Sequence, residues 1–362
     1  MIYAIYFVFF FLILRFVVTL FNFVSDPQLR RVSRQYHHFV SILIPVRNEE
    51  DNILHLLNSI KNQDYSNYEV IIYDDGSTDN TASLCSDFVK TDQRFSIIEG
   101  NALPRGWLGK NYACHHLATA AKGEYLLFLD ADEKIYDNLV NSAIHRMLLN
   151  KLSLLSLFAN QQMPTTGEKM VVPLMHFILL NLLPLRLVFL IKNASVAAAS
   201  GQFMFFDAAA YKEYQWHKQV KNMIVEDIGI MRQVKANGLN AETLLANGMV
   251  SCRMYNGFFE GINGFSKNFL AAFNYSIPGF LFFLLLLVGG PILVIFTTDL
   301  SLLFFFIGLI ILTRIMISLT ARQNVFYNVL LHPLQMLSLV AISYTAIQRH
   351  LTKSTVWKGR RV

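Results

Sequence analysis

Residues 125–132 read YLLFLDAD, and residues 68–79 read YEVIIYDDGSTD. In both stretches an apolar run typical of a buried strand ends directly in paired carboxylates. Predicted strands and helices alternate outward from these stretches, with strands over 39–45, 68–73, 95–98 and 125–129 and helices over 51–61, 78–89, 111–121 and 138–149. This alternation predicts an α/β domain on a mostly parallel mixed sheet. Because ligands bind beside the carboxyl ends of such strands, both acidic pairs lie where chemistry is expected.

The composition indicates a membrane protein that carries a folded domain. Of the 362 residues, 54% are hydrophobic and only 15% are charged, against about 25% charged in soluble domains. The charges concentrate between Asp26 and Lys267, and both ends are apolar. The three cysteines are far apart and form no CxxC pair, which argues against a zinc ribbon or a disulfide framework and fits a reducing compartment.

Four regions are expected along the chain. Residues 1–24 contain one charge, Arg15, and are long enough to span a bilayer; with no basic stretch before them and no small-residue cleavage site after them, an uncleaved anchor is predicted. The expected regions are a transmembrane anchor at 1–24, a cytoplasmic domain at 38–275 with an interfacial or buried helix at 170–191, two or three spans at 277–348, and a basic tail at 349–362.

Basic residues gather at the ends of the apolar stretches. The net charge is +6, and much of it lies at membrane boundaries, where Lys and Arg set topology more often than they bind nucleic acid. Arg30, Arg31 and Arg34 place the following residues in the cytoplasm. Three C-terminal spans, with the last at 325–347, would put the basic tail outside, against the positive-inside rule. We therefore favour a cytoplasmic tail.

Three acidic motifs carry the expected chemistry. The residue types of the DDGSTD stretch are typical of a turn followed by the start of a helix. A turn does not explain why two carboxylates directly follow a buried strand. Carboxylates at that position can bind a nucleotide. Asp130 and Asp132 lie on one side of an extended segment and can share a cation such as Mg²⁺ or Mn²⁺. Glu226 and Asp227 open a predicted helix, where they either favour the helix dipole or supply a general base.

Five stretches in this order resemble the family-2 inverting glycosyltransferases, which have an A-type nucleotide-sugar-binding fold. They are IPVRNEE at 44–50, YDDGSTD at 73–79, GWLGKN at 106–111, FLDAD at 128–132 and VED at 225–227. The similarity covers about 40–275. Within the family the chain is most similar to the membrane-anchored carotenoid-type enzymes, the 4,4'-diaponeurosporenoate glycosyltransferases, on WLGKN at 107–111, RMY at 253–255, SKN at 266–268, HPL at 332–334 and WKGR at 357–360.

The resemblance implies roles at matching positions. Asp75, with Asp74 beside it, would contact the nucleotide base; Asp132 and Asp130 would hold the metal and the diphosphate. Asp227 would be the catalytic base, with Glu226 alongside. Further residues would line the nucleotide pocket (Pro45, Arg47, Glu49), contact the diphosphate (Lys110, Arg253) or lie near the acceptor (Trp107, Gly201, Gln202).

The sequence thus predicts a multi-pass membrane enzyme that transfers one sugar, glucose from a UDP donor, to a lipophilic acceptor such as a carotenoid acid. The QxxRW motif of the processive members is absent, since this region reads Cys252-Arg253-Met254-Tyr255, which disfavours a polysaccharide synthase. A nucleotide-binding transporter or scaffold is the alternative from another class. Arg314 and His332 lie in apolar stretches, where a charge is costly, and the sequence assigns them no role. Oligomeric state is not predicted.

Overall fold

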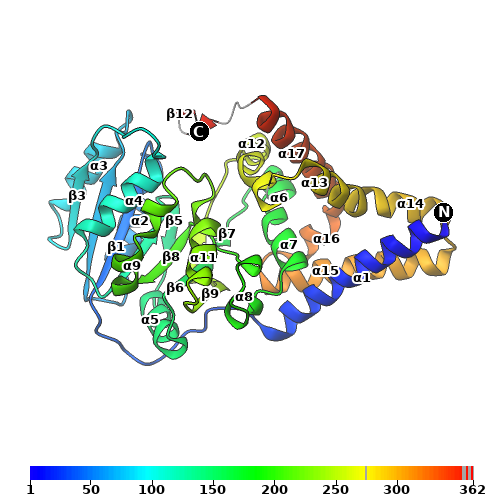
Figure 1. Ribbon diagram of the computed structural model, residues 1–362, viewed down its shortest axis with the longest axis horizontal. Helices are drawn as coiled ribbons and strands as arrows, with labels where there is room; N and C mark the ends of the chain where they lie inside the picture. The colour runs from blue at the N-terminus through cyan, green and yellow to red at the C-terminus, as the bar shows by residue number, and fades with distance from the viewer. Residues whose placement is uncertain (274, 353–355, 358–359, 362) are drawn as a thin grey trace.

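The computed structural model describes residues 1–273, 275–352, 356–357 and 360–361. A seven-stranded sheet forms the centre of its larger part, in the order β3-β2-β1-β4-β8-β6-β9 (Figure 1). The strands are β1 (Val40–Val46), β2 (Tyr68–Asp74), β3 (Phe95–Glu99), β4 (Tyr125–Leu129), β6 (Leu154–Phe158), β8 (Phe203–Asp207) and β9 (Ala241–Leu245). β8 runs antiparallel to both β4 and β6, and the other pairings are parallel. The mixed, mostly parallel sheet confirms the predicted fold class.

Helices cover both faces of this sheet because the strands are apolar on both sides. Ile42 and Ile44 of β1 pack with one group of helices, and Leu43 of the same strand packs with the other. The first group comprises α2 (Ile53–Lys61), α3 (Thr81–Val89) and α5 (Leu139–Asn150). The second comprises α4 (Gly109–Ala120), α9 (Ala208–Tyr214), α10 (Trp216–Gln219) and α11 (Glu226–Ala236). Each predicted element from 39 to 149 is present, with ends shifted by up to three residues.

A small second sheet lies beside the acidic loop that follows β4. Its order is β5-β10-β7, from β5 (Glu133–Ile135), β10 (Val250–Cys252) and β7 (Asn160–Gln161). β10 pairs antiparallel with β5, so that Cys252 lies opposite Glu133. A residue from the far end of the domain is thereby placed next to the DAD stretch.

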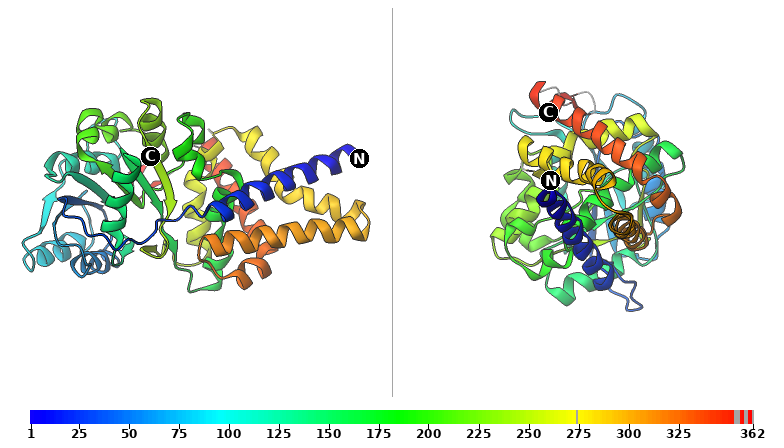
Figure 2. Two further views of the ribbon diagram at one scale, coloured as in Figure 1. Left: turned by 90° about the horizontal axis from the view of Figure 1, so that it is seen from below. Right: turned by 90° about the vertical axis from the view of Figure 1, so that its right-hand side faces the viewer.

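Three helices are long and apolar enough to cross a membrane. They are α1 (Ile2–Ser25), the continuous segment Ile277–Thr297 and α15 (Leu300–Thr320). The middle segment joins α13 (Ile277–Leu284), a π-helical turn at Leu285–Gly289 and α14 (Gly290–Thr297). All three extend away from the sheet domain on one side of the molecule (Figures 1 and 2).

The apolar stretch at 325–347 is not among these three candidate spans of the described residues. It is divided between α16 (Val325–Leu330) and α17 (His332–Thr352), and α17 packs against α6 (Thr166–Val171) and α12 (Phe258–Asn268). The buried face of α17 includes Gln335, Ser338 and Ser343, which suits contact with protein groups rather than lipid tails. Of the basic tail, only residues 349–352, 356–357 and 360–361 lie within the described part; β11 (Val356–Trp357) pairs with β12 (Arg360–Arg361).

The segment 170–191, where an interfacial or buried helix is predicted, is divided among the end of α6, α7 (Pro173–Leu182) and α8 (Arg186–Leu190). α7 packs against the end of α1, where the Asn22 side chain donates to the carbonyls of Leu180 and Leu183, each over 2.9 Å. Leu185 N donates back to Asn22 Oδ1 over 2.8 Å. The candidate span α1 is thus hydrogen-bonded to α7 and to the residue before α8.

Candidate active site

A cavity of about 2030 Å³ opens at the carboxyl edge of the sheet. β1 lies between β2 and β4, so the loops after these strands diverge there and leave a crevice, the usual ligand position in such sheets. Thirteen of the fourteen predicted site residues line it: Pro45, Arg47, Glu49, Asp75, Trp107, Lys110, Asp130, Asp132, Gly201, Gln202, Glu226, Asp227 and Arg253.

Asp74 is the exception, because its carboxylate holds the turn that follows β2. Its side chain accepts hydrogen bonds from Ser77 N over 3.2 Å and from Ser77 Oγ. The interpretation of the DDGSTD stretch as a turn therefore accounts for the role of the Asp74 carboxylate. Asp75 is 5% exposed and lines the cavity, and Arg47 Nη1 donates to the carbonyls of Asp75 and, over 3.0 Å, of Gly76. This part of the cavity wall is polar, and hydrogen bonds hold its loop in place.

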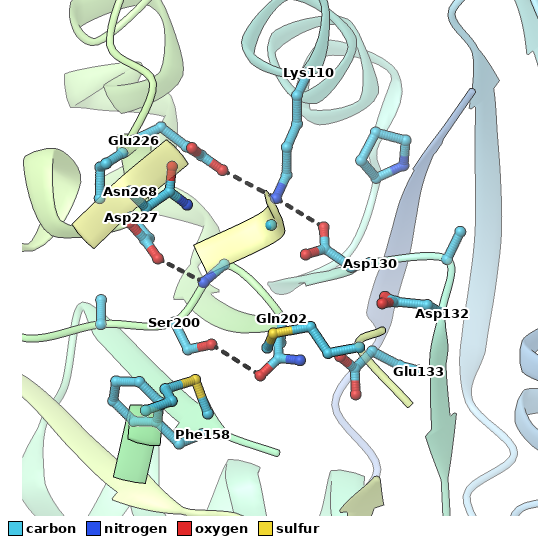
Figure 3. Close-up of a pocket in the computed structure, with 18 of the residues that line it drawn as sticks. Lys110, Asp130, Asp132, Glu133, Phe158, Ser200, Gln202, Glu226, Asp227 and Asn268 are labelled. Carbon is cyan, nitrogen blue, oxygen red and sulfur yellow. Dashed lines mark hydrogen bonds and ion pairs between the residues drawn. The ribbon is translucent and has the colours of Figure 1, made fainter. Parts of the chain in front are cut away.

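Lys110 joins two of the acidic motifs (Figure 3). It lies in the first turn of α4, and its Nζ is 2.8 Å from Asp130 Oδ1 and 3.0 Å from Glu226 Oε1. Burial lowers the pKa of Lys110, but Asp130 and Glu226 together raise it well above its usual value. The ammonium therefore stays protonated and holds the ends of β4 and α11 at a fixed separation.

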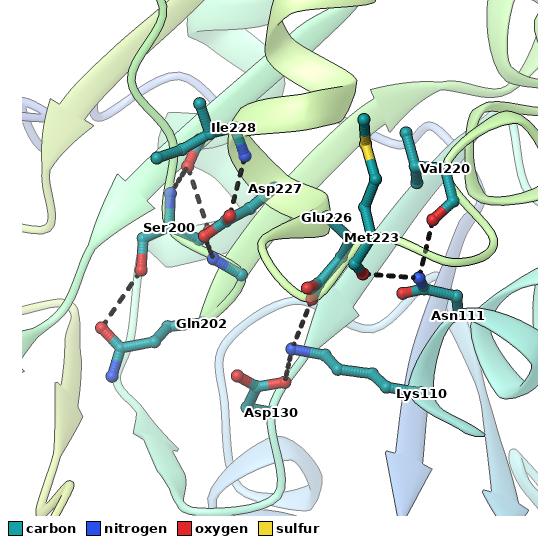
Figure 4. A network of polar contacts seen from close by, with 12 residues as sticks. Lys110, Asn111, Asp130, Ser200, Gln202, Val220, Met223, Glu226, Asp227 and Ile228 are labelled. Carbon is teal, nitrogen blue, oxygen red and sulfur yellow. Dashed lines mark hydrogen bonds and ion pairs between the residues drawn. The ribbon is translucent and has the colours of Figure 1, made fainter. Parts of the chain in front are cut away.

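Asp227 is held by two backbone amides (Figure 4). Gly201 N donates to Oδ2 over 2.9 Å, and Ile228 N donates to Oδ1 over 2.7 Å. Burial, and then the neighbouring Glu226, raise the pKa of Asp227 to about 7, against the opposing effects of Ile228, Lys110 and Gly201. A carboxylate whose pKa is near neutral can accept a proton at physiological pH, which is the requirement for a general base.

The segment 200–202 forms the wall beside Asp227. Ser200 N donates to Ser156 Oγ over 2.8 Å, and Ser200 Oγ donates to Gln202 Oε1 over 3.2 Å (Figure 4). Gln202 is 6% exposed and directly precedes β8. Gly201 and Gln202 thus form the turn before β8 and line the cavity on a hydrogen-bonded segment.

The DAD stretch separates its two carboxylates. Asp130 faces Lys110 (Figure 3). Asp132 lies beside Cys252, whose Sγ is 3.3 Å from Asp132 Oδ2. The Asp132 and Glu133 carboxylates and the Cys252 thiol present ligand atoms within 4.8 Å of one another. The side chains that could hold a metal ion together are therefore Asp132, Glu133 and Cys252, whereas Asp130 is paired with the Lys110 ammonium.

The residues at this cluster fit a divalent cation. Glu133 is 1% exposed, and both of its carboxylate oxygens are buried with no hydrogen-bond partner. Burial, with Asp130 as a second cause, raises the pKa of Asp132 to about 6, and burial next to Asp132 raises that of Glu133 well above its usual value. Two adjacent buried carboxylates become favourable when a hard cation lies between them.

Two further predicted residues lie at the cavity with partners of their own. Arg253 Nη2 is 2.8 Å from Glu168 Oε1, and its side chain is 43% exposed. Trp107 stacks on His115, with ring centroids 5.4 Å apart, and Leu108 N donates to Lys221 O over 2.8 Å. These contacts fix the Trp-Leu-Gly-Lys loop, and they leave Arg253 partly open to the cavity.

Part of the lining of the same cavity is apolar. Side chains from α7, α12 and the following turn form it together with residues near β6 and β10; they are Phe158, Met175, Ile178, Leu179, Leu182, Leu183, Met254, Phe265 and Phe269. These elements adjoin two of the candidate spans, since α1 and α15 both pack on α7. One cavity thus connects carboxylates and an ammonium with apolar side chains next to the candidate spans.

The model described as Glycosyl transferase family 2 matches residues 41–214, from β1 to the end of α9. The chain carries a family 2 glycosyltransferase domain. For residues 41–214, this confirms the family that the motifs indicated. Asp227, Glu226 and Arg253 lie C-terminal to the matched residues, although they line the same cavity.

Two curated relatives and one solved structure that are similar to this chain are also named as glycosyltransferases. The chain is 27% identical over 259 residues to the 4,4'-diaponeurosporenoate glycosyltransferase of Staphylococcus haemolyticus, covering 70% of this chain and 67% of that protein. It is 29% identical over 103 residues to glycosyltransferase GlyG of Streptococcus pneumoniae, covering 28% of this chain and only about a third (33%) of the length of GlyG.

The mannosyltransferase PcManGT from Pyrobaculum calidifontis, solved in complex with GDP-Man and Mn²⁺, is similar in structure with a TM-score of 0.57. The match covers 97% of this chain and 100% of that one at 14% identity, and it shows that the glycosyltransferase fold is shared. The similarity extends along almost the whole chain, beyond the residues of the family model.

Sequence reasoning missed two residues of the candidate metal site, Glu133 and Cys252. Glu133 directly follows the DAD stretch, so its position beside Asp132 was a signal that could have found it. Cys252 reaches the cluster only through the antiparallel pairing of β10 with β5, which joins positions about 120 residues apart. No local pattern encodes that pairing.

Proposed function

We propose that this protein is an inverting glycosyltransferase that moves one sugar from a UDP-sugar, UDP-glucose being the expected donor, to a lipophilic acceptor at the membrane. The observation that carries the proposal is the continuous cavity, in which Asp227, Lys110 and Asp132 share one space with an apolar wall of α7 and α12 side chains. A donor and an apolar acceptor both need access to such a space.

Asp227 is the proposed base. The proton of the acceptor hydroxyl or carboxylic acid passes to the Asp227 carboxylate, the acceptor oxygen bonds to the anomeric carbon, and the bond from that carbon to the diphosphate oxygen breaks. The two amide donors to Asp227 keep its carboxylate oriented during this transfer. Attack opposite to the departing diphosphate inverts the anomeric centre.

The donor half of the cavity suits a nucleoside diphosphate. Asp75, Arg47, Glu49 and Pro45 are proposed to contact the nucleoside, while Lys110 and Arg253 face the charge that develops on the leaving diphosphate. When Mg²⁺ or Mn²⁺ is bound, Asp132 and Glu133 would hold it, and it supplies the charge neutralisation that a departing diphosphate needs.

The acceptor is proposed to be a membrane lipid or a carotenoid acid. The name of the Staphylococcus haemolyticus relative states that it glycosylates 4,4'-diaponeurosporenoate, and the apolar wall here supports an acceptor of that chemical class. Trp107, Gly201 and Gln202 line the cavity and are proposed acceptor contacts. A single transfer is favoured over chain synthesis because the QxxRW stretch is absent.

The proposed location is the cell membrane, with the glycosyltransferase domain in the cytoplasm. Three candidate spans, one before the domain and two after it, support this arrangement. After two C-terminal crossings the chain returns to the side on which the domain lies. The basic tail is then cytoplasmic, which agrees with the positive-inside rule.

A transfer assay tests the proposal. The full-length protein in detergent, given UDP-glucose, Mn²⁺ and a membrane lipid extract, is expected to yield a hexosylated lipid visible by mass spectrometry. Asp227→Asn should lower the rate by about 10²–10⁴-fold, whereas Asp87→Asn on the exposed face of α3 should leave it unchanged. An Asp227→Asn enzyme as fast as the wild type would show that the base is misassigned.

The products separate the alternatives. A long water-soluble saccharide would identify a processive synthase, and UDP binding without any turnover would identify a nucleotide-binding transporter or scaffold. Retention of the donor's anomeric configuration, measured by NMR, would contradict the inverting assignment.

A further inference from the structure

A second cavity, of about 400 Å³, begins directly after the candidate span α1. Its volume is within the usual range of small-molecule sites, about 300–1,000 Å³. Residues from the segment after α1, from α5 and from α8 line it, and four of them are arginines: Arg30, Arg31, Arg146 and Arg186. Among the described residues of this lining, Asp26 is the only acidic one. We call this cavity the basic pocket.

Two of the four arginines already have acidic partners. Arg30 Nη2 is 3.4 Å from Asp26 Oδ2, in a pair that solvent reaches from both sides. Arg146 donates through Nε and Nη2 to the two carboxylate oxygens of Glu242, which is buried. Since an exposed ion pair is weak, Arg30 can exchange Asp26 for another anion. Arg146 is committed to its buried carboxylate.

The hydrogen bonds of the other two arginines go to main-chain carbonyls. Arg31 Nη1 donates to Asp137 O over 2.9 Å, and Arg186 Nη2 donates to Ser25 O over 3.0 Å. Among the ion pairs of the described residues, none includes Arg31 or Arg186. Arg31 is exposed and Arg186 is half-buried, so an anion in the pocket can reach both. The pocket therefore presents two positive charges that no described carboxylate offsets.

The length of α1 places the basic pocket at the level of lipid headgroups. The 24 residues of α1 extend for about 36 Å, whereas the hydrocarbon core of a bilayer is about 30 Å thick. The end of a membrane-spanning α1 therefore lies in the headgroup layer. Arg186 contacts the carbonyl of Ser25, the last residue of α1, and Asp26 of the pocket follows it.

Exposed apolar side chains surround the pocket and agree with this level. Val24, the last apolar residue of α1, is 74% exposed. Leu149, at the end of α5, lines the pocket and is 60% exposed, and Leu190, at the end of α8, is also exposed. Three elements thus present apolar side chains beside a basic pocket, which is the arrangement that a lipid with a charged headgroup requires.

We propose that the basic pocket binds the phosphate of an anionic membrane phospholipid, with Arg31 and Arg186 as its charged contacts. The N–H groups of a guanidinium match the oxygens of a phosphate, and the acyl chains would lie along the exposed apolar side of α1. The lipid then joins the end of α1 to α5 and α8. The pocket is distinct from the catalytic cavity, since Arg31 is the only described residue in the lining of both.

Lipid retention tests the proposal. The full-length protein in detergent is equilibrated with equal amounts of phosphatidylglycerol and phosphatidylcholine, and the retained lipids are counted by native mass spectrometry. Wild type should prefer phosphatidylglycerol, and Arg186→Gln should lower that preference about fivefold, the effect of one arginine beside an anionic surface. Arg186→Lys, which keeps the charge, should preserve most of it. Lys90→Gln, directly after α3 at the opposite end of the molecule from the candidate spans, is the matched control and should behave as wild type (Figure 1).

Arg31→Gln provides a second variant, because Arg31 is exposed and its loss leaves the contact between Arg186 and Ser25 in place. It should lower the preference by a similar factor. An absent preference in wild type, or an unchanged one in Arg31→Gln and Arg186→Gln proteins that circular dichroism shows to be folded, would overturn the proposal. Displacement of phosphatidylglycerol by inorganic phosphate at the same concentration would assign the pocket to a soluble anion and would also overturn it.

Discussion

The backbone amide of Gly201 lies 2.9 Å from Asp227 Oδ2, and a Cβ atom at Gly201 would be only 3.0 Å from Lys110 Nζ and 3.3 Å from Glu226 Oε1. The glycine therefore has two roles at one point. It brings a hydrogen-bond donor to the proposed base, and its lack of a side chain leaves room for the Lys110 ion pairs.

Gly201→Ala is expected to lower kcat by about tenfold to a hundredfold, because the added methyl group pushes Lys110 or Glu226 away and a shift of 1 Å in a catalytic group can cost about that much. The protein should remain folded, since the lysine end is flexible. Steady-state transfer rates, with circular dichroism to check the fold, measure this effect.

Gly308→Ala is the matched control, because a Cβ atom there meets no atom within 4 Å. It should leave kcat unchanged. A Gly201→Ala enzyme with wild-type kcat would show that the contact between segment 200–202 and Lys110 has no catalytic importance.

The raised pKa of Asp227 predicts an acidic limb in the pH profile. A base must be deprotonated to act, so kcat/KM should fall as the pH drops below about 7, by about tenfold for each unit. Above pH 7 the rate should level off, since Asp227 is then ionised. A profile that stays flat between pH 5 and pH 8 would argue against Asp227 as the base.

The sequence predicted the strands and helices from 39 to 149 because apolar alternation and turn residues are local signals. Thirteen of the fourteen predicted site residues line one cavity, because the carboxyl ends of parallel strands lie at the same edge of a sheet. The remaining features depend on long-range contacts. The Asp74 carboxylate accepts hydrogen bonds within the turn that follows β2. Cys252 lies next to Asp132 because β10 pairs with β5. α17 packs on α6 and α12 through a partly polar face, which a count of apolar residues does not reveal.

Glu133→Gln is expected to weaken divalent cation binding by about tenfold to a hundredfold, because it removes one of the two charged ligands while keeping the shape. Titration of Mn²⁺ followed by electron paramagnetic resonance measures the affinity without requiring turnover. Wild type should bind in the absence of acceptor, and EDTA should remove both the bound ion and the transfer activity.

Glu213→Gln is the control for this substitution, since Glu213 is exposed on α9. Its Mn²⁺ affinity should equal that of wild type. Unchanged Mn²⁺ binding in Glu133→Gln would restrict the cation ligands to Asp132 and its other neighbours.

Lys110→Gln should act on both rate and pH profile. The Lys110 ammonium lowers the pKa of Asp227, so its removal raises that pKa, and the acidic limb should move to higher pH. Loss of the ammonium should also lower kcat by about 10²–10³-fold, as for other groups that stabilise developing negative charge. Lys110→Arg keeps the positive charge and should preserve the midpoint of the profile, even where its longer side chain reduces kcat. A Lys110→Gln enzyme whose midpoint stays near pH 7 would mean that the ammonium is electrostatically uncoupled from Asp227, and Lys110 would then act only through its contacts with Asp130 and Glu226.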